Sequence, residues 1–186
     1  MDAAIHAILY SDLVGSTALT ARIGDERARD MIRSHYEQPC EEAVANYHGR
    51  IFKRLGDGIL ADFGSARQAV QCAREIHRRL RSDDSRLKAR IGITVGEPVE
   101  EAGDFFGTAV NTAQRAASIG REAETVVSAG VVEAVGQMQG TRFLELAPKR
   151  VKGLPAGSAS LSQKMRPRHY REPRAFEAGR VFVGLR

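Results

Sequence analysis

The sequence is poor in cysteine, with Cys40 and Cys72 as the two in 186 residues. These two lie far outside any CxxC spacing, which excludes a disulfide scaffold and a zinc finger. The chain also lacks a run of 18 apolar residues without a charge, and its first residues lack the basic stretch and cleavage site of a signal peptide. We therefore predict a cytoplasmic protein that makes no membrane contact.

Several well-known catalytic motifs are missing. The sequence contains no GxSxG, HExxH, GxxxxGK[ST] or GxGxxG segment. Its five histidines share no spacing typical of metal ligands. Any metal chemistry must therefore use oxygen ligands.

The excess of positive charge is confined to one end of the chain. Residues 163–186 contain seven basic and two acidic side chains, which accounts for the whole net charge of +5. The other 162 residues carry equal numbers of each sign, so the body shows no basic bias typical of nucleic-acid binding. We predict a folded domain over residues 1–162 and a poorly packed arginine-rich tail over 163–186, and we consider nucleic acid an unlikely partner.

Apolar periodicity predicts ten elements in the body. They are a strand at 3–10, a helical stretch from Ser16 or Thr17 to Tyr47, strands at 51–55 and 59–63, a helix at 66–80, a strand at 88–95, a helix at 108–119, a strand at 125–128, a helix at 131–135 and a strand at 142–146. Pro39 should kink the first helical stretch. This order predicts an α+β fold, a ferredoxin-like split βαβ sheet with helices on one side and C-terminal additions.

Two aspartates stand at positions suited to chemistry. Asp12 closes the first strand, and Asp57 lies in the Gly56-Asp57-Gly58 turn of a predicted hairpin beside it. Their carboxylates can converge at one edge of the sheet, where hard oxygen ligands suit Mg²⁺ or Mn²⁺. Taken singly, each aspartate is better explained as turn chemistry.

The residues that follow Asp12 favour the functional interpretation. Gly15-Ser16-Thr17 forms a glycine turn that leads into a helix N-terminus, where free N–H groups can bind phosphate oxygens. Farther along, Asn111 and Arg115 share one helix face and could orient a sugar and neutralise phosphoryl charge. An arginine on an exposed helix face is more often merely solvated.

Four motifs together resemble the class III nucleotidyl cyclase catalytic domain. They are Ser11-Asp12-Leu13-Val14-Gly15-Ser16-Thr17, Lys53-Arg54-Leu55-Gly56-Asp57-Gly58, the segment from Asp104 to Arg115 and Val151-Lys152-Gly153-Leu154-Pro155. They occur in the order of that family and cover roughly residues 5–157. The resemblance implies a head-to-tail homodimer of the adenylyl cyclase type that converts ATP to cyclic AMP and pyrophosphate between its subunits.

The resemblance also implies roles for individual residues. Asp12 and Asp57 would hold two metal ions per site, Mg²⁺ or Mn²⁺, with help from the backbone carbonyl of Leu13. Gly15, Ser16 and Thr17 match the turn that contacts the phosphates. The residues implied for the rest of the substrate are Lys53 and Asp104 for the base, Asn111 for the ribose, Arg115 for the α-phosphate and Lys152 for the terminal phosphates.

Hydrogen-bond polarity favours adenine over guanine. Lys53 can only donate and Asp104 can only accept, which complements N1 and N6 of adenine, whereas guanine presents the opposite pattern. Three alternatives stay open: a guanylyl cyclase, a catalytically silent cyclase-like module for dimerisation or binding, and an anion binder that acts through the basic tail. The segment Ala159–Ser162 is expected to be a reduced final strand.

Overall fold

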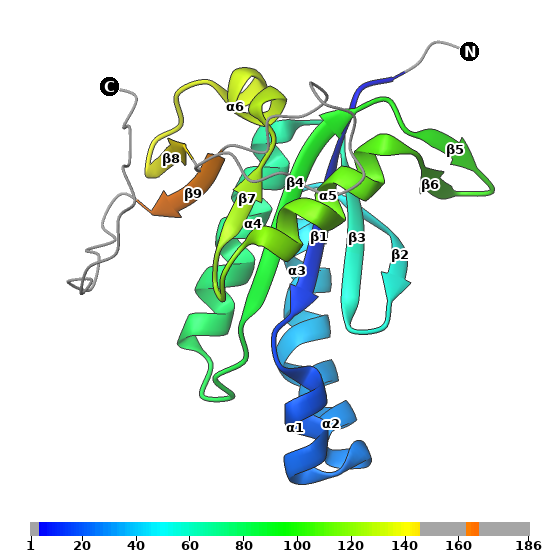
Figure 1. Cartoon of the computed structure of the whole chain (residues 1–186), viewed down its shortest axis with the longest axis vertical. Helices are drawn as coiled ribbons and strands as arrows, with labels where there is room; N and C mark the ends of the chain where they lie inside the picture. The colour runs from blue at the N-terminus through cyan, green and yellow to red at the C-terminus, as the bar shows by residue number, and fades with distance from the viewer. Residues whose placement is uncertain (1–3, 146–162, 168–186) are drawn as a thin grey trace.

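A seven-stranded mixed sheet forms the centre of the fold (Figure 1). In the computed structural model the described residues are 4–145 and 163–167. The strands are β1 His6–Leu13, β2 Arg50–Leu55, β3 Gly58–Phe63, β4 Ala89–Gly96, β5 Val99–Glu101, β6 Asp104–Phe106, β7 Thr125–Val127, β8 Thr141–Glu145 and β9 Gln163–Pro167. The sheet order is β2-β3-β1-β4-β7-β9-β8, with β1 antiparallel to both neighbours and β4 parallel to β7. The end of β1 therefore lies beside the start of β3.

Helices connect the strands. They are α1 Ser16–Ile23, α2 Asp25–Ile32, the π-helix η1 Arg33–Glu37, α3 Gln38–Asn46, α4 Ala66–Ser82, α5 Thr108–Ile119 and α6 Ala129–Val135. The expected kink at Pro39 takes the form of η1, which ends two residues before this proline. A proline ring collides with the carbonyl four residues earlier, here that of His35 within η1, and a wider turn avoids the collision.

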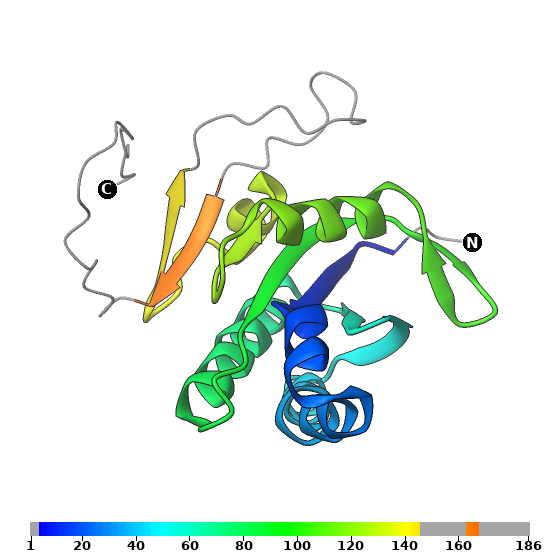
Figure 2. The same cartoon turned by 60° about the horizontal axis from the view of Figure 1, so that its bottom comes forward.

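Side chains from alternate positions of β1 enter two separate apolar clusters. Ala7 and Leu9 pack in the large cluster together with residues of α2, α3, α4 and α6. Ile8 packs in a smaller cluster with residues of α5, among them Ala113. Figure 2 shows α5 and α4 on opposite sides of the sheet. The α+β split sheet is confirmed, but the expectation of helices on one side is wrong for α5, because β1 and β4 are apolar on both faces and periodicity cannot assign a helix to either.

Helix α5 lies unusually close to the sheet because β4 has a glycine beneath it. A Cβ atom added to Gly92 would lie 1.9 Å from the carbonyl oxygen of Ala113 and 2.6 Å from the backbone nitrogen of Ala117. The helix could reach this depth only over a residue without a side chain. This contact fixes the helix that carries Asn111 and Arg115.

We expect Gly92→Ala to destabilise the fold by about 2–3 kcal/mol, since backbone atoms of α5 must move away from the new methyl group. Thermal and urea unfolding would measure the loss. Gly64→Ala is the matched control, because a Cβ at Gly64 meets nothing within 4 Å. Equal stability of the two variants would contradict the close contact between α5 and β4.

Three details differ from the sequence expectations. Strand β1 extends to Leu13, so that Asp12 lies inside the strand and pairs with Arg90 of β4. The connection before Asp104 forms the hairpin β5–β6, which was not predicted. The expected strand at 159–162 lies outside the described residues, while β9, within the segment expected as tail, pairs with β7 and β8.

No helix among the described residues combines the length and the apolar character that a membrane crossing requires.

Candidate active site

Asp12 lies near the end of β1 and is held on two sides. Its Oδ2 accepts a hydrogen bond from Nη2 of Arg90 at 2.5 Å, and its Oδ1 accepts one from the Tyr10 hydroxyl at 3.4 Å. Arg90 stands directly opposite Asp12 in the β1–β4 ladder. An antiparallel cross-strand pair of opposite charge is favourable, and here it orients the carboxylate.

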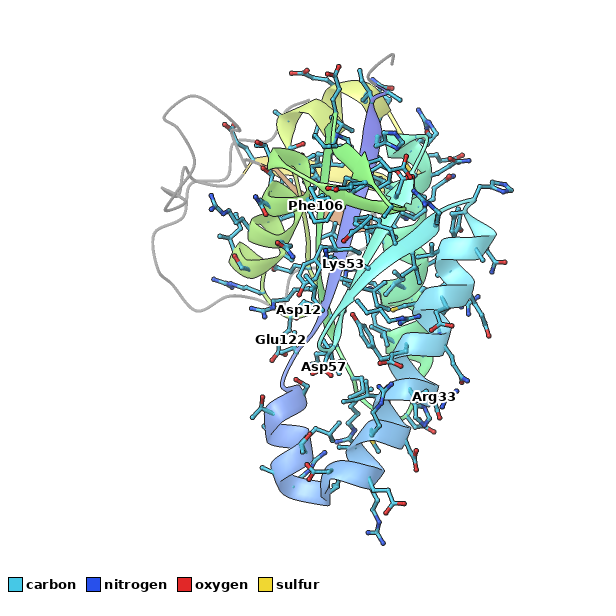
Figure 3. The ribbon with its side chains drawn as sticks, turned by 90° about the vertical axis from the view of Figure 1, so that its right-hand side faces the viewer. Asp12, Arg33, Lys53, Asp57, Phe106 and Glu122 are labelled. Carbon is cyan, nitrogen blue, oxygen red and sulfur yellow. The ribbon has the colours of Figure 1, made fainter. Side chains whose placement is uncertain are left out.

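Asp57 lies close to Asp12 and Tyr10. It occupies the turn between β2 and β3, where Gly56 has a φ of +58°. The Tyr10 side chain packs over Gly58, the residue that follows Asp57. A Cβ atom added to Gly58 would lie 2.4 Å from the Tyr10 hydroxyl oxygen. Burial raises the pKa of Tyr10 to about 12, with further contributions from Asp12 and Asp57. Asp12 bonds this hydroxyl, and Figure 3 shows Asp57 at the same end of the sheet as Asp12.

The chain turns into α1 directly after β1. Gly15 adopts a φ of +77° as the N-cap residue, and its carbonyl oxygen accepts from the amide of Leu19 at 2.9 Å. The expectation that Ser16 or Thr17 caps this helix is wrong, because α1 begins at Ser16 and has no side-chain cap. An uncapped first turn leaves its amide groups available for an anion.

Lys53 and Asp104 come together from distant parts of the sequence. The Lys53 ammonium forms an ion pair with Oδ2 of Asp104, whose Oδ1 accepts from the amide of Phe105 at 2.8 Å. The same ammonium lies 4.7 Å from the centre of the Phe106 ring. In Figure 3, Lys53 lies between Asp12 and Phe106. This pair offers one donor and one acceptor side by side.

Asn111 and Arg115 lie on α5 and are not bonded to the acidic pair, Asp12 and Asp57. Within residues 4–145, no hydrogen bond or ion pair connects either side chain to Asp12 or Asp57. Nη1 of Arg115 is buried and has no hydrogen-bond partner among the described residues. A buried guanidinium nitrogen without a partner is costly, and an anionic group brought to α5 would satisfy it. Lys152 lies outside the described residues.

The donor set at Asp12 and Asp57 fits a hard divalent cation. The Asp57 carboxylate makes no hydrogen bond or ion pair in the described part of the chain, so its oxygens are free to coordinate. No group of three or more His, Cys, Asp or Glu side chains gathers anywhere within those ranges. An ion at this place therefore needs further oxygens from the backbone or from a bound ligand, as is usual for Mg²⁺ with phosphates.

The fold matches one known class of domain. Residues 4–165 match the family model for the adenylate and guanylate cyclase catalytic domain. The chain belongs to this family, which confirms the resemblance drawn from the four motifs.

Individual relatives agree with this assignment. A Streptomyces coelicolor protein named adenylate cyclase is 32% identical over 127 residues, which cover 68% of this chain and 33% of that protein. A crystal structure titled as an adenylate/guanylate cyclase/hydrolase from Silicibacter pomeroyi has 30% identity and a TM-score of 0.67, covering 87% of this chain and 94% of that one. The adenylyl cyclase CyaB from P. aeruginosa shares the fold, with 20% identity, a TM-score of 0.71 and coverage of 90% and 95%. The chain spans about a quarter to a third of the length of the curated relatives it matches.

Sequence reasoning missed three residues that contact the site. Tyr10 and Arg90 both bond Asp12, and Phe106 lies against Lys53. Strand β4 gave one available signal, because Arg90 is its one charged residue. Such an arginine needs a partner on the neighbouring strand, and Asp12 supplies it.

Proposed function

We propose that this domain is an adenylyl cyclase that converts ATP to 3′,5′-cyclic AMP and pyrophosphate. The observation that carries the proposal is that Asp12 and Asp57 lie at the same end of the sheet (Figure 3), where β1 leads into the uncapped start of α1. Two carboxylates next to free amide groups form a place for a cation-bound triphosphate. Relatives named adenylate cyclase support the choice of reaction.

The acidic pair would hold two divalent cations, Mg²⁺ or Mn²⁺, with the Leu13 carbonyl as an additional ligand. Bound there, the ions would lower the pKa of the ribose 3′-hydroxyl and neutralise phosphate charge. Arg90 keeps the Asp12 carboxylate in one orientation. The amides of Gly15, Ser16 and Thr17 would bind phosphate oxygens at the start of α1.

The remaining residues would bind the rest of ATP. Lys53 would donate to N1 of adenine and Asp104 would accept from its N6 amino group. Asn111 would orient the ribose, and Arg115 would stabilise the charge that grows on the α-phosphate. Lys152 would bind the terminal phosphates.

We propose that one active site is shared by two chains in a head-to-tail homodimer. Among the described residues Arg115 makes no hydrogen bond or ion pair with Asp12 or Asp57, and its Nη1 is buried without a partner, which supports this arrangement. Four large apolar side chains are exposed among the described residues, Ile5, Leu55, Val99 and Phe106, and the last two lie on the β5–β6 hairpin. Apolar surface of this kind is typical of an interaction site. The cytoplasmic location stays a prediction.

The direct test incubates the purified protein with ATP or GTP and with Mn²⁺ or Mg²⁺, and separates the products by chromatography. We expect cyclic AMP and pyrophosphate in equal amounts, and loss of product in Asp12→Asn, which keeps the shape of the side chain but not its charge. Asp84→Asn, an exposed aspartate beyond α4, is the control. Cyclic GMP as the main product would favour the guanylyl alternative, and absence of both products would favour a silent module.

A further inference from the structure

We propose that Tyr36 is a positioning residue for Asp12, acting through Ser11 from the opposite face of the sheet. The proposal rests on the function proposed above, because it assigns Tyr36 to the metal-binding step of that site. Tyr36 is fully buried, and among the described residues its hydroxyl bonds to Ser11 and to neither aspartate. Its influence on the position of Asp12 therefore passes through Ser11 and the backbone of β1.

The link is a buried hydrogen bond. The hydroxyl groups of Tyr36 and Ser11 lie 2.9 Å apart, and both residues have a relative exposure of 0%. A phenylalanine at position 36 would fill the same apolar volume. Burying a hydroxyl is unfavourable unless it is hydrogen-bonded, so the tyrosine is explained by its bond to Ser11 rather than by packing.

Ser11 occupies the point where β1 separates from β3. The β1–β3 ladder ends with the pair Ser11↔Ile59, whereas Asp12 pairs only with Arg90 of β4. Asp57 lies two residues before Ile59. The pair Ser11↔Ile59 thus sets the relative position of the two aspartates. The hydrogen bond with Tyr36 holds Ser11 within this pair.

The π-helix is what brings Tyr36 to this point. Buried residues of the continuous helical stretch recur every fourth position, at Ala28, Ile32, Tyr36, Cys40 and Val44. In an α-helix a four-residue step overshoots a full turn by about 40°, so four steps would drift by about 160°. The wider turn of η1, in which the amide of Gln38 bonds to the carbonyl of Arg33, removes part of this drift. It keeps Tyr36 facing Ser11 while the flanking helices stay packed.

The variant Tyr36→Phe separates positioning from packing. It removes one oxygen atom and keeps the ring, and Ser11 retains the Cys40 thiol as a hydrogen-bonding neighbour, so we expect a folded protein. Binding of Mn²⁺ is measured by electron paramagnetic resonance with 3′-deoxy-ATP, which lacks the attacking hydroxyl and cannot be cyclised. We expect the concentration of Mn²⁺ for half-saturation to rise three- to tenfold. In turnover at saturating Mn²⁺, we expect KM for ATP to change less than twofold.

Three further variants complete the test. Tyr47→Phe is the matched control, since Tyr47 follows α3, packs against the same core and makes no bond to β1. Ser11→Ala should weaken Mn²⁺ binding at least as much as Tyr36→Phe, because it removes the bond to Tyr36 and also the hydrogen-bonding neighbour of the Cys40 thiol. The Ser11→Ala/Tyr36→Phe double variant should weaken binding no further than Ser11→Ala alone, because the bond between the two hydroxyls is already absent. Unchanged Mn²⁺ binding in Tyr36→Phe, with only a lower melting temperature, would reduce Tyr36 to a structural role. If the wild type binds Mn²⁺ but forms no cyclic product, the proposed reaction fails while the role of Tyr36 is still decided by the binding data.

Discussion

Asp57→Ala and Arg115→Ala chains should each be inactive alone and should regain about a quarter of wild-type activity when mixed. Loss of Asp57 removes a ligand of the cations, and loss of Arg115 removes the group that meets the growing phosphate charge. We expect each single variant to fall by at least about 1,000-fold, as for other charge-stabilising groups in phosphoryl transfer. A colorimetric pyrophosphate assay has the range to measure this.

The expected recovery of about a quarter of the activity follows from counting intact active sites. Random exchange of equal amounts makes half of the dimers mixed, and each mixed dimer has one site with both residues intact and one with neither. The structure motivates the experiment because Arg115 meets no acidic site residue within its own chain, at least in residues 4–145. An arginine so placed is available to a phosphate bound by the acidic pair of a second chain.

A double variant gives the sharpest control. Asp57→Ala/Arg115→Ala mixed with either single variant should restore nothing, because no site can then receive both residues. Subunit exchange is demonstrated separately with two affinity tags of different size. Full exchange without recovery in the first mixture would exclude the shared site, and substantial activity of either single variant alone would exclude the assigned role of that residue.

The sequence predicts much of this fold because most of its signals are local. Alternating or continuous apolar runs marked the long strands, and glycine marked the turn that holds Asp57. The β5–β6 hairpin was missed because Val99–Glu101 and Asp104–Phe106 are three residues long each and show no usable periodicity. The side of the sheet that α5 covers depends on Gly92, and a glycine in a strand says nothing about which helix lies above it.

The site shows the same division between local and distant signals. Asp12 and Asp57 could be paired from the predicted neighbouring strands, and Figure 3 shows both at the same end of the sheet. Tyr36 could not be found in this way, because its bond to Ser11 spans 25 residues and depends on a π-helical turn. The proline that favours such a turn was visible, but the sequence does not state whether a helix kinks or widens before it.

The second large expected effect is on the choice of base. Lys53→Glu combined with Asp104→Cys should lower the preference for ATP over GTP, expressed as the ratio of kcat/KM values, on the order of 100-fold or more. Lys53 and Asp104 lie together as one donor and one acceptor. The double variant offers an acceptor where Lys53 donates and a weak donor where Asp104 accepts, which matches N1–H and O6 of guanine instead of adenine.

The change in nucleotide preference must be distinguished from a general disturbance of β2 and the β5–β6 hairpin. Arg50 of β2 and Glu100 of β5 form an exposed ion pair at 3.0 Å between the same two parts of the fold, which makes Arg50→Glu/Glu100→Arg the matched control. We expect this exchange to leave the ATP to GTP ratio within twofold of the wild type, because neither side chain belongs to the Lys53–Asp104 pair. A double variant of Lys53 and Asp104 that loses activity equally toward both nucleotides would show that the pair supports the site without reading the base. A ratio that moves toward GTP while the control stays unchanged requires that these two side chains contact the base edge itself.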